Sequence, residues 1–129
     1  MNVPSMTSRR PLRVLLVDDA AEMRALLRAL FAERPDIAIY EAGSGEEALE
    51  VASAAHPDLV IMDHHMPGMD GVTATRHLKD LDEHIDVVAF TAVPGNERDF
   101  ARAGAIGHYR KDMFNALVAY VLERAATAA

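Results

Sequence analysis

Short apolar runs alternate with amphipathic stretches along most of this chain, and the two patterns predict strands and helices in turn. The apolar runs are nearly continuous, which is typical of strands covered on both faces of a sheet. They predict five strands, at 12–17, 37–40, 59–62, 87–90 and 105–109. Apolar positions at helical spacing and capping residues predict five helices, at 21–31, 44–55, 72–81, 96–104 and 112–124. Five strand–helix units in succession predict a parallel α/β sheet with helices on both faces.

Capping and turn residues mark the ends of several predicted helices. Ser44 and Glu47 have the spacing of a capping box, which places a helix start at Ser44. We expect Asn96 and Asp112 to cap the two helices that follow them with their side-chain oxygens. Gly104 suits the left-handed position that commonly follows a helix.

The chain of 129 residues has the length of one domain, and half of its residues are apolar, which is typical of a globular protein. We expect one domain over residues 12–124. Residues 1–11 contain no apolar stretch of signal-peptide length and predict a disordered tail. The alanine-rich residues 125–129 predict a second, frayed tail.

The formal net charge of −7 argues against a direct nucleic-acid partner, which would require a basic surface. No apolar run is long enough to cross a bilayer, so we expect no membrane segment. The chain contains no cysteine, which excludes disulfides, a thiol nucleophile and zinc held by sulfur. We expect a cytoplasmic protein.

Polar side chains with catalytic potential follow four of the five predicted strands. They are Asp18 and Asp19, Asp63, Thr91, and Lys111. Each alone has a structural explanation, because Asp and Thr often form caps or turns and a single Lys is usually solvated. Together they fall at one edge of the sheet, where open α/β sheets bind ligands. Three close carboxylates cannot all stay ionised without a cation, so the pattern predicts a hard divalent metal ion.

This set of groups fits phosphoryl transfer. A carboxylate can act as the nucleophile and form an aspartyl phosphate. Acidic ligands can hold Mg²⁺, and Mn²⁺ could replace it. A hydroxyl and an ammonium group can bind the incoming phosphoryl oxygens.

Four motifs occur in order along the chain. They are Val17-Asp18-Asp19, Asp63 followed by Met66-Pro67-Gly68-Met69-Asp70-Gly71, Phe90-Thr91-Ala92, and Gly104-Ala105-Ile106-Gly107 leading to Lys111. Over residues 12–124 the chain resembles the CheY-like receiver domains of two-component response regulators. The resemblance implies a doubly wound, flavodoxin-like fold with five parallel strands in the order 2-1-3-4-5, flanked by five helices.

The resemblance also implies a role for each residue at the strand ends. Asp63 would be the phosphoacceptor, and Thr91 and Lys111 would contact the phosphoryl group. The implied metal ligands are Asp63, Asp19 directly, Asp18 mainly through water, and the backbone carbonyl of His65. The implied phosphodonor is a histidine kinase or a histidine phosphotransfer protein, and the signal passes to a downstream protein target. Such a module catalyses its own phosphorylation and slow dephosphorylation but is not a turnover enzyme.

One position departs from the family pattern. Family members usually carry Tyr or Phe three residues before the lysine, and here that position is His108. The neighbouring Tyr109 would point to the opposite face of the strand, so it cannot substitute. We expect His108 to act with Thr91 as the rotating switch residue, which would make the switch sensitive to pH. The alternative is a weakened switch.

Other positions near the site also matter. Asp112 stands where the family usually has Pro, often with a cis bond, so we expect a trans bond here. His64 and His65 are expected to be solvated loop residues, although adjacent imidazoles near carboxylates could bind a transition metal. Val93 and His65 correspond to side chains that flank the hydrolytic water. Because valine cannot orient water, we expect a long-lived phosphoryl group.

The last predicted helix is apolar on two sides. Its core-facing stripe consists of Phe114, Leu117, Val118 and Val121. A second apolar line is formed by Met113, Ala116 and Tyr120. This line predicts an interface with a downstream protein or with a second copy of the chain, as a homodimer. The alternative is an ordinary surface of small apolar residues.

Three other interpretations stay open. A phosphatase of the haloacid-dehalogenase type also uses a strand-end Asp and Mg²⁺, but it needs a second Asp two residues later, where this chain has His65. A pseudo-receiver would keep the fold and act as an interaction module without phosphorylation. The chain could also be the receiver fragment of a longer regulator.

Overall fold

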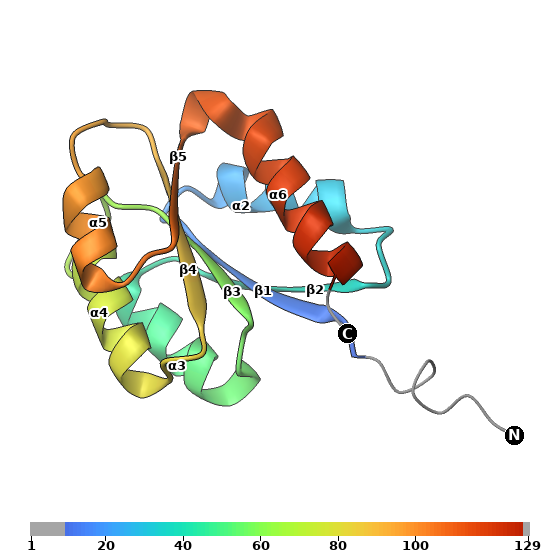
Figure 1. The fold of residues 1–129 in the computed structure, drawn as a ribbon, viewed down its shortest axis with the longest axis horizontal. Helices are drawn as coiled ribbons and strands as arrows, with labels where there is room; N and C mark the ends of the chain where they lie inside the picture. Colours follow the sequence, from blue (N-terminus) through green and yellow to red (C-terminus); the bar gives the residue numbers. More distant parts are fainter. Residues whose placement is uncertain (1–9, 128–129) are drawn as a thin grey trace, which may run out of the picture.

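The computed structural model describes residues 10–127, which form a five-stranded sheet with helices on both sides (Figure 1). The strands are β1 (Leu12–Val17), β2 (Ile37–Ala42), β3 (Leu59–Met62), β4 (Asp86–Thr91) and β5 (Gly107–Arg110). Neighbouring strands are parallel throughout, and their order is β2-β1-β3-β4-β5. The predicted α/β fold and its strand order are confirmed.

Five α-helices connect the strands. They are α2 (Ala21–Phe31), α3 (Gly45–Ala55), α4 (Gly71–Leu81), α5 (Glu97–Ala103) and α6 (Phe114–Thr127), and a 3₁₀ turn, η1 (Lys111–Met113), precedes the last. Helices α2 and α6 lie on one side of the sheet, and α3, α4 and α5 lie on the other (Figure 1). The connections change direction between β1 and β3, which makes the carboxyl ends of these two strands the natural binding crevice. Within residues 10–127, no helix combines the length and hydropathy that a membrane span requires.

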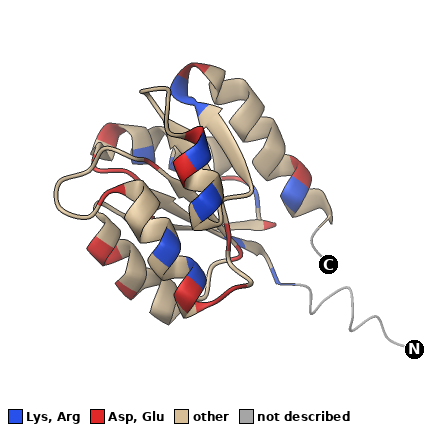
Figure 2. Cartoon of the chain, turned by 60° about the vertical axis from the view of Figure 1, so that its left-hand side comes forward, with Lys and Arg blue, Asp and Glu red and all other residues tan. Residues whose placement is uncertain are grey.

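The two sides of the sheet enclose separate hydrophobic layers. On β1, Val14 and Leu16 belong to the layer beneath α2 and α6, while Leu15 and Val17 belong to the layer beneath α3, α4 and α5. All four side chains are at most 2% exposed. A strand buried on both faces needs no polar alternation, which explains the continuous apolar run in the sequence. Charged residues lie mainly in the helices and in the loops (Figure 2).

Two helix starts are fixed by side-chain caps. The Oγ atom of Ser44 accepts a hydrogen bond from the backbone N–H of Glu47 (3.0 Å), as predicted. The carboxylate of Glu47 accepts from the backbone N–H of Gly43 (2.6 Å), one residue before the partner that a capping box would use. Asp70 caps α4 by accepting from the N–H of Thr73 (2.8 Å). This second cap anchors the loop that connects β3 to α4.

Two other predicted caps lack the expected side-chain bond. Asn96 precedes α5, but its side chain makes no capping bond and contacts His108 instead. Asp112 lies within η1, and its carboxylate accepts a hydrogen bond from Nε of Arg110 (3.0 Å). In both cases a partner outside the helix engages the side-chain oxygen that the cap would have used. Gly104 does end α5 in the left-handed conformation, with φ +113°.

The predicted terminal tails need correction. Helix α6 continues to Thr127, and Ala125 is only 5% exposed in the layer beneath α2 and α6. Residues 125–127 are therefore helical rather than frayed, because one of them contributes to the core. The remainder of both predicted tails, residues 1–9 and 128–129, lies outside the described part of the chain.

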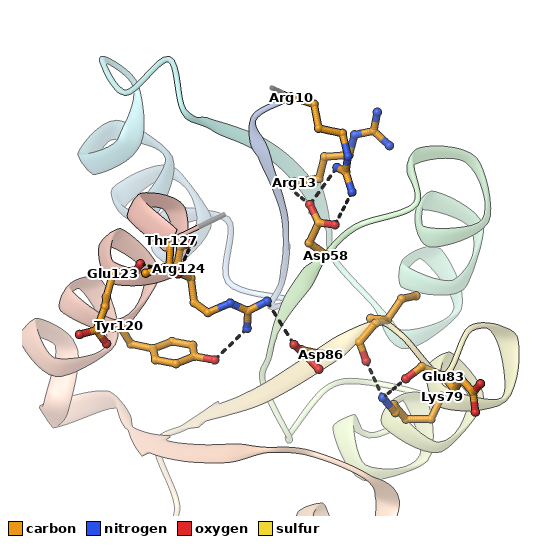
Figure 3. A network of polar contacts seen from close by, with 11 residues as sticks. Arg10, Arg13, Asp58, Lys79, Glu83, Asp86, Tyr120, Glu123, Arg124 and Thr127 are labelled. Atoms are coloured by element: carbon orange, nitrogen blue, oxygen red, sulfur yellow. Dashed lines mark hydrogen bonds and ion pairs between the residues drawn. The ribbon is translucent and has the colours of Figure 1, made fainter. Parts of the chain in front are cut away.

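Two ion pairs lie at the amino end of the sheet, opposite the carboxyl edge. Arg10, within the predicted N-terminal tail, forms a two-pronged ion pair with Asp58 at 2.6 and 2.9 Å (Figure 3). Arg124 on α6 contacts Asp86 at the start of β4 (3.1 Å) and donates to the hydroxyl of Tyr120 (3.0 Å). These contacts connect the chain before β1 with the residue before β3, and α6 with the start of β4.

Candidate functional site

Three carboxylates meet at the carboxyl edge of the sheet. Asp18 follows β1 and Asp63 follows β3, and these strands are neighbours in which Val17 pairs with Met62. Carboxylate oxygens of Asp18, Asp19 and Asp63 lie within 4.8 Å of one another. Asp18 and Asp63 are buried (5% and 8% exposed), whereas Asp19 is exposed. The predicted convergence of the three carboxylates is confirmed.

Backbone bonds and one glycine hold Asp63 in place. Its N–H donates to the carbonyl of Val17 (2.9 Å), which continues the sheet pattern past the end of β3. The carbonyl of His64 accepts from the N–H of Gly71 (2.9 Å) at the start of α4. A Cβ atom at position 71 would lie 1.9 Å from the carbonyl oxygen of Asp63. This close approach requires glycine and fixes the loop after Asp63 against α4.

Lys111 reaches the carboxylates from the end of β5. Its Nζ donates to Oδ2 of Asp18 at 2.6 Å and lies 3.5 Å from Oδ1 of Asp63. The ammonium group also lies 5.6 Å from the ring centroid of Phe90. The peptide bond between Lys111 and Asp112 is trans, as predicted. Lys111 therefore pairs chiefly with Asp18 rather than with the predicted phosphoacceptor, a preference that the sequence did not indicate.

The surroundings of Asp63 disfavour the ionised form of its carboxyl group. Burial raises the pKa of its carboxyl above the ordinary value, and the nearby charges of Asp18 and Asp19 raise it further. The ammonium group of Lys111 and a backbone hydrogen bond at His64 lower the pKa, but they do not offset these effects. One lysine cannot balance three carboxylates, so the pocket attracts an additional cation.

The donor set fits a hard divalent cation. Carboxylate oxygens are the ligands that Mg²⁺ and Mn²⁺ prefer, and the exposed Asp19 leaves an open side where water ligands can remain. Within residues 10–127, the group able to hold a metal ion consists of Asp18, Asp19 and Asp63, without His64 or His65. A transition-metal site on the two imidazoles thus finds no support among these residues. The backbone carbonyl of His65 as a further ligand stays a prediction.

Thr91 ends β4, one strand beyond Asp63. Strands β3 and β4 pair with Met62 opposite Ala89, which places Thr91 at the same edge of the sheet. Its side chain is buried, and its hydroxyl donates to the carbonyl of Val93 at 3.3 Å. The hydroxyl therefore bonds within its own loop, and rotation about one side-chain bond would redirect it.

Two neighbouring rings of β5 lie on opposite faces, as predicted. His108 faces α5, where its ring centroid lies 5.9 Å from that of Phe100. Tyr109 faces α6, where its ring centroid lies 5.9 Å from that of Tyr120. The Nε2 atom of His108 is hydrogen-bonded to the side-chain oxygen of Asn96 (2.7 Å). His108 is therefore already packed inward, and its rotation and pH sensitivity stay predictions.

Asn96 is a residue of this region whose contacts the sequence did not reveal. It is 7% exposed, and its side-chain N–H donates to the carbonyl of Val93 (3.3 Å) while its oxygen faces His108. Its position before a helix predicted a cap. No local sequence signal identifies His108, twelve residues later on β5, as its partner.

His64 is not the solvated loop residue that was expected. Its ring is half-buried, with centroids 4.8 Å from the ring of His65 and 5.5 Å from that of Phe100. Its Nδ1 atom is buried and has no hydrogen-bond partner among the described residues. His65 is exposed, as expected. The packing of His64 connects the loop after Asp63 with α5.

The second apolar line on the last helix is exposed only in part. Met113 is 40% exposed and Ala116 is exposed, but Tyr120 packs against Tyr109 and accepts a hydrogen bond from Arg124. The middle of α6 contains no charged residue (Figure 2). The apolar surface available to a partner is therefore smaller than the sequence predicted.

The sequence of this chain is similar to those of known proteins. Residues 14–121 match the family model described as the response regulator receiver domain. The chain is 35% identical over 112 residues to the nitrate/nitrite response regulator protein NarL of Escherichia coli, covering 84% of this chain and 51% of that protein. It is 41% identical over 101 residues to the chemotaxis protein CheY of Halobacterium salinarum, covering 77% of this chain and 83% of that protein. The chain thus spans about half the length of NarL.

The fold is shared with solved structures. One is the response regulator protein TrrA of Thermotoga maritima in complex with Mg²⁺ and BeF, which aligns with a TM-score of 0.73 and 28% sequence identity. The alignment covers 84% of this chain and 97% of that one.

Proposed function

Because the chain belongs to the family of response regulator receiver domains, we propose that it is a signalling module that accepts a phosphoryl group on Asp63. The donor is a histidine kinase or a histidine phosphotransfer protein, and the response is a change in binding to a downstream protein. The observation that carries this proposal is the buried carboxylate of Asp63, which lies beside two further carboxylates and the ammonium group of Lys111. The module turns over no small substrate.

Asp63 is better suited to be the nucleophile than Asp18. Both oxygens of Asp18 are engaged, one by the N–H of Ala20 (2.9 Å) and the other by Lys111 (2.6 Å). Asp63 is held more loosely, 3.5 Å from the lysine. Its carboxylate oxygen attacks the phosphorus atom, an O–P bond forms, and the P–N bond to the donor imidazole breaks. The electron pair of that bond stays on the imidazole nitrogen, which takes up a proton from water.

The groups around Asp63 stabilise the negative charge of the phosphoryl oxygens. A divalent cation, Mg²⁺ or Mn²⁺, held by Asp18, Asp19, Asp63 and the carbonyl of His65, supplies positive charge at this place when bound. Lys111 lies close enough to Asp63 to offer its ammonium group to a phosphoryl oxygen.

Thr91 supplies a hydroxyl donor for the same oxygens. Its present acceptor, the carbonyl of Val93, belongs to its own loop at 3.3 Å, so the hydroxyl can leave that bond for a charged partner. A hydrogen bond to a phosphoryl oxygen is stronger than one to a neutral carbonyl, which favours the change.

Loss of the phosphoryl group is slow in this proposal. The side chains that would flank the hydrolytic water are those of His65 and Val93, and Val93 is 46% exposed in the loop after β4. Valine has neither a donor nor an acceptor to orient water. The expected long lifetime depends on His65 not taking over that task.

The output surface includes the exposed apolar groups at the start of the last helix. Met113 and Ala116 remain accessible, and Tyr120 borders them with its half-buried ring. We propose that a downstream protein or a second copy of the chain binds here when the phosphorylation state changes.

The phosphorylated residue can be located chemically. After incubation with acetyl phosphate and Mg²⁺, borohydride reduction converts an aspartyl phosphate to homoserine, which peptide mass spectrometry then identifies. We expect conversion at position 63 in the wild type and in the control Asp80→Asn, because Asp80 is exposed on α4. Conversion at another aspartate would contradict the assignment. Conversion nowhere would favour a pseudo-receiver that works without phosphorylation.

A further inference from the structure

A continuous series of hydrogen bonds connects Thr91 at the pocket with His108 on β5. The hydroxyl of Thr91 and the side-chain N–H of Asn96 both donate to the carbonyl oxygen of Val93, each at 3.3 Å. The side-chain oxygen of Asn96 lies 2.7 Å from Nε2 of His108. A carbonyl oxygen has two lone pairs, so Val93 can accept both bonds at once. The pocket and β5 are thus joined through one loop and one buried side chain.

Both polar ends of the Asn96 side chain are used in this series. The residue is 7% exposed and makes no capping bond to α5. Because its Nδ2 donates to Val93, its Oδ1 faces His108, and the assignment of the proton follows from the network: Nε2 of His108 must carry it. Breaking either bond would leave a buried polar group without a partner, which is unfavourable. The bond from Asn96 to Val93 and the bond between Asn96 and His108 are therefore expected to change together.

On the basis of the proposed function, we propose that Asn96 is a positioning residue that transmits the state of Thr91 to His108. When the hydroxyl of Thr91 turns to a phosphoryl oxygen, the carbonyl of Val93 loses one of its two donors. Its remaining donor is Asn96, so a shift of this carbonyl moves Asn96 and changes the bond to His108. Gly95 lies between Val93 and Asn96, and its φ of +102° is a left-handed backbone conformation that glycine adopts readily.

The packing of His108 directs this change toward α5. Its ring lies 5.9 Å from that of Phe100, a fully buried residue of α5. The ring of His64, in the loop after the phosphoacceptor, lies 5.5 Å from Phe100 as well. A shift of His108 therefore alters how α5 packs on the sheet. The imidazole transmits a change in hydrogen bonding and does not need to rotate between an outer and an inner position.

The test follows the imidazole of His108 by NMR in the full chain, with and without Mg²⁺ and beryllium fluoride as a phosphoryl mimic. The variant Asn96→Asp keeps an oxygen for His108 but removes the N–H that donates to Val93. The variant Asn96→Ala removes both bonds. The control is Asn115→Ala, because Asn115 is exposed on α6. A spectrum of His108→Gln assigns the resonance.

We expect the mimic to shift the His108 resonance in the wild type and in Asn115→Ala, and to shift it at least about fivefold less in both Asn96 variants. Phosphoryl uptake from acetyl phosphate should change less than about twofold in the Asn96 variants, because Asn96 does not touch the reacting atoms. A full shift in either Asn96 variant would overturn this inference while leaving the proposed function intact. A wild type that takes up no phosphoryl group would overturn both.

Discussion

Lys111 and Asp18 form a short ion pair at the carboxyl edge of the sheet, with Nζ and Oδ2 2.6 Å apart. The pair joins the end of β5 to the end of β1 across 93 positions of sequence. Lys111 thereby neutralises a carboxylate that we propose as a metal ligand. The ammonium group and a divalent cation are expected to compete for the same negative charge.

Replacing Lys111 by Met should tighten metal binding and slow phosphorylation. Removal of one cation from the group of carboxylates should raise the affinity for Mg²⁺ about tenfold, or about 1.4 kcal/mol. Loss of the ammonium group should lower the rate of phosphoryl uptake about 100-fold, because it no longer stabilises the phosphoryl oxygens. Titration calorimetry with Mg²⁺ and the rate of mass gain with acetyl phosphate measure the two effects separately.

The matched control for this substitution is Lys79→Met. Lys79 donates to the carbonyls of Glu83 and Ile85 at the amino end of the sheet, away from the carboxylates (Figure 3). Its loss should leave Mg²⁺ affinity unchanged. Equal affinities for Mg²⁺ in the wild type and in Lys111→Met would rule out the competition.

Asp63→Asn should stabilise the metal-free protein at neutral pH. The pKa of Asp63 is raised in the folded state, chiefly by burial and then by the charge of Asp18. A group with a raised pKa contributes stability that is fully present below its unfolded-state pKa and is lost as the pH rises through its folded-state pKa. The Asn side chain does not ionise, so the variant does not undergo this loss. Its free energy of unfolding, relative to that of the wild type, should therefore rise through that pH window and then level off.

Denaturant unfolding in the presence of EDTA, repeated over a series of pH values, measures this advantage. Asp80→Asn, which removes a carboxylate at an exposed position of α4, serves as the control. An Asp63→Asn variant that is less stable than the wild type at neutral pH would contradict the account of the buried charge.

Gly71→Ala should destabilise the fold and distort the site. The added Cβ atom would lie 1.9 Å from the carbonyl oxygen of Asp63, so backbone must move. We expect a loss of at least about 3 kcal/mol in the free energy of unfolding. Gly43→Ala is the control, because its Cβ would meet only ordinary contacts at 3.4 Å or more. Thermal unfolding of the two variants compares them, and equal stability would show that the loop after β3 is not constrained as described.

Val93→Gln should shorten the lifetime of the phosphoryl group. The amide would supply the donor and acceptor needed to orient a water molecule, which valine lacks, and we expect decay about tenfold faster. Val93→Leu is the control without hydrogen-bonding groups. The decay is followed by intact mass after removal of the phosphodonor. Loss of the phosphoryl group within seconds from the wild type would show that another residue, such as His65, already positions the water.

The location of Asp18, Asp63 and Thr91 could be predicted from the sequence because it depends on local pattern. Each follows a short apolar run, and parallel strands bring their carboxyl ends to one edge. The position of Gly71 in a turn-rich motif was also visible. Its physical reason, the contact with the carbonyl of Asp63, needed the structure.

The contacts of Asn96 and Lys111 could not be predicted, because they depend on which side chains meet across the sheet. Asn96 before a helix and Asp112 after a lysine both suggest caps, yet the side-chain oxygen of each is bonded to another residue. Likewise, the preference of Lys111 for Asp18 over Asp63 follows from the exact reach of one side chain.

The central claim is that Asp63 accepts a phosphoryl group in a metal-dependent reaction. The most direct measurement is the intact mass of the wild type and of Asp63→Asn after incubation with acetyl phosphate, with Mg²⁺ and with EDTA. The account predicts the gain of one phosphoryl group in the wild type with Mg²⁺, and no gain in the variant or in EDTA. No gain in the wild type, or an equal gain in Asp63→Asn, would contradict it.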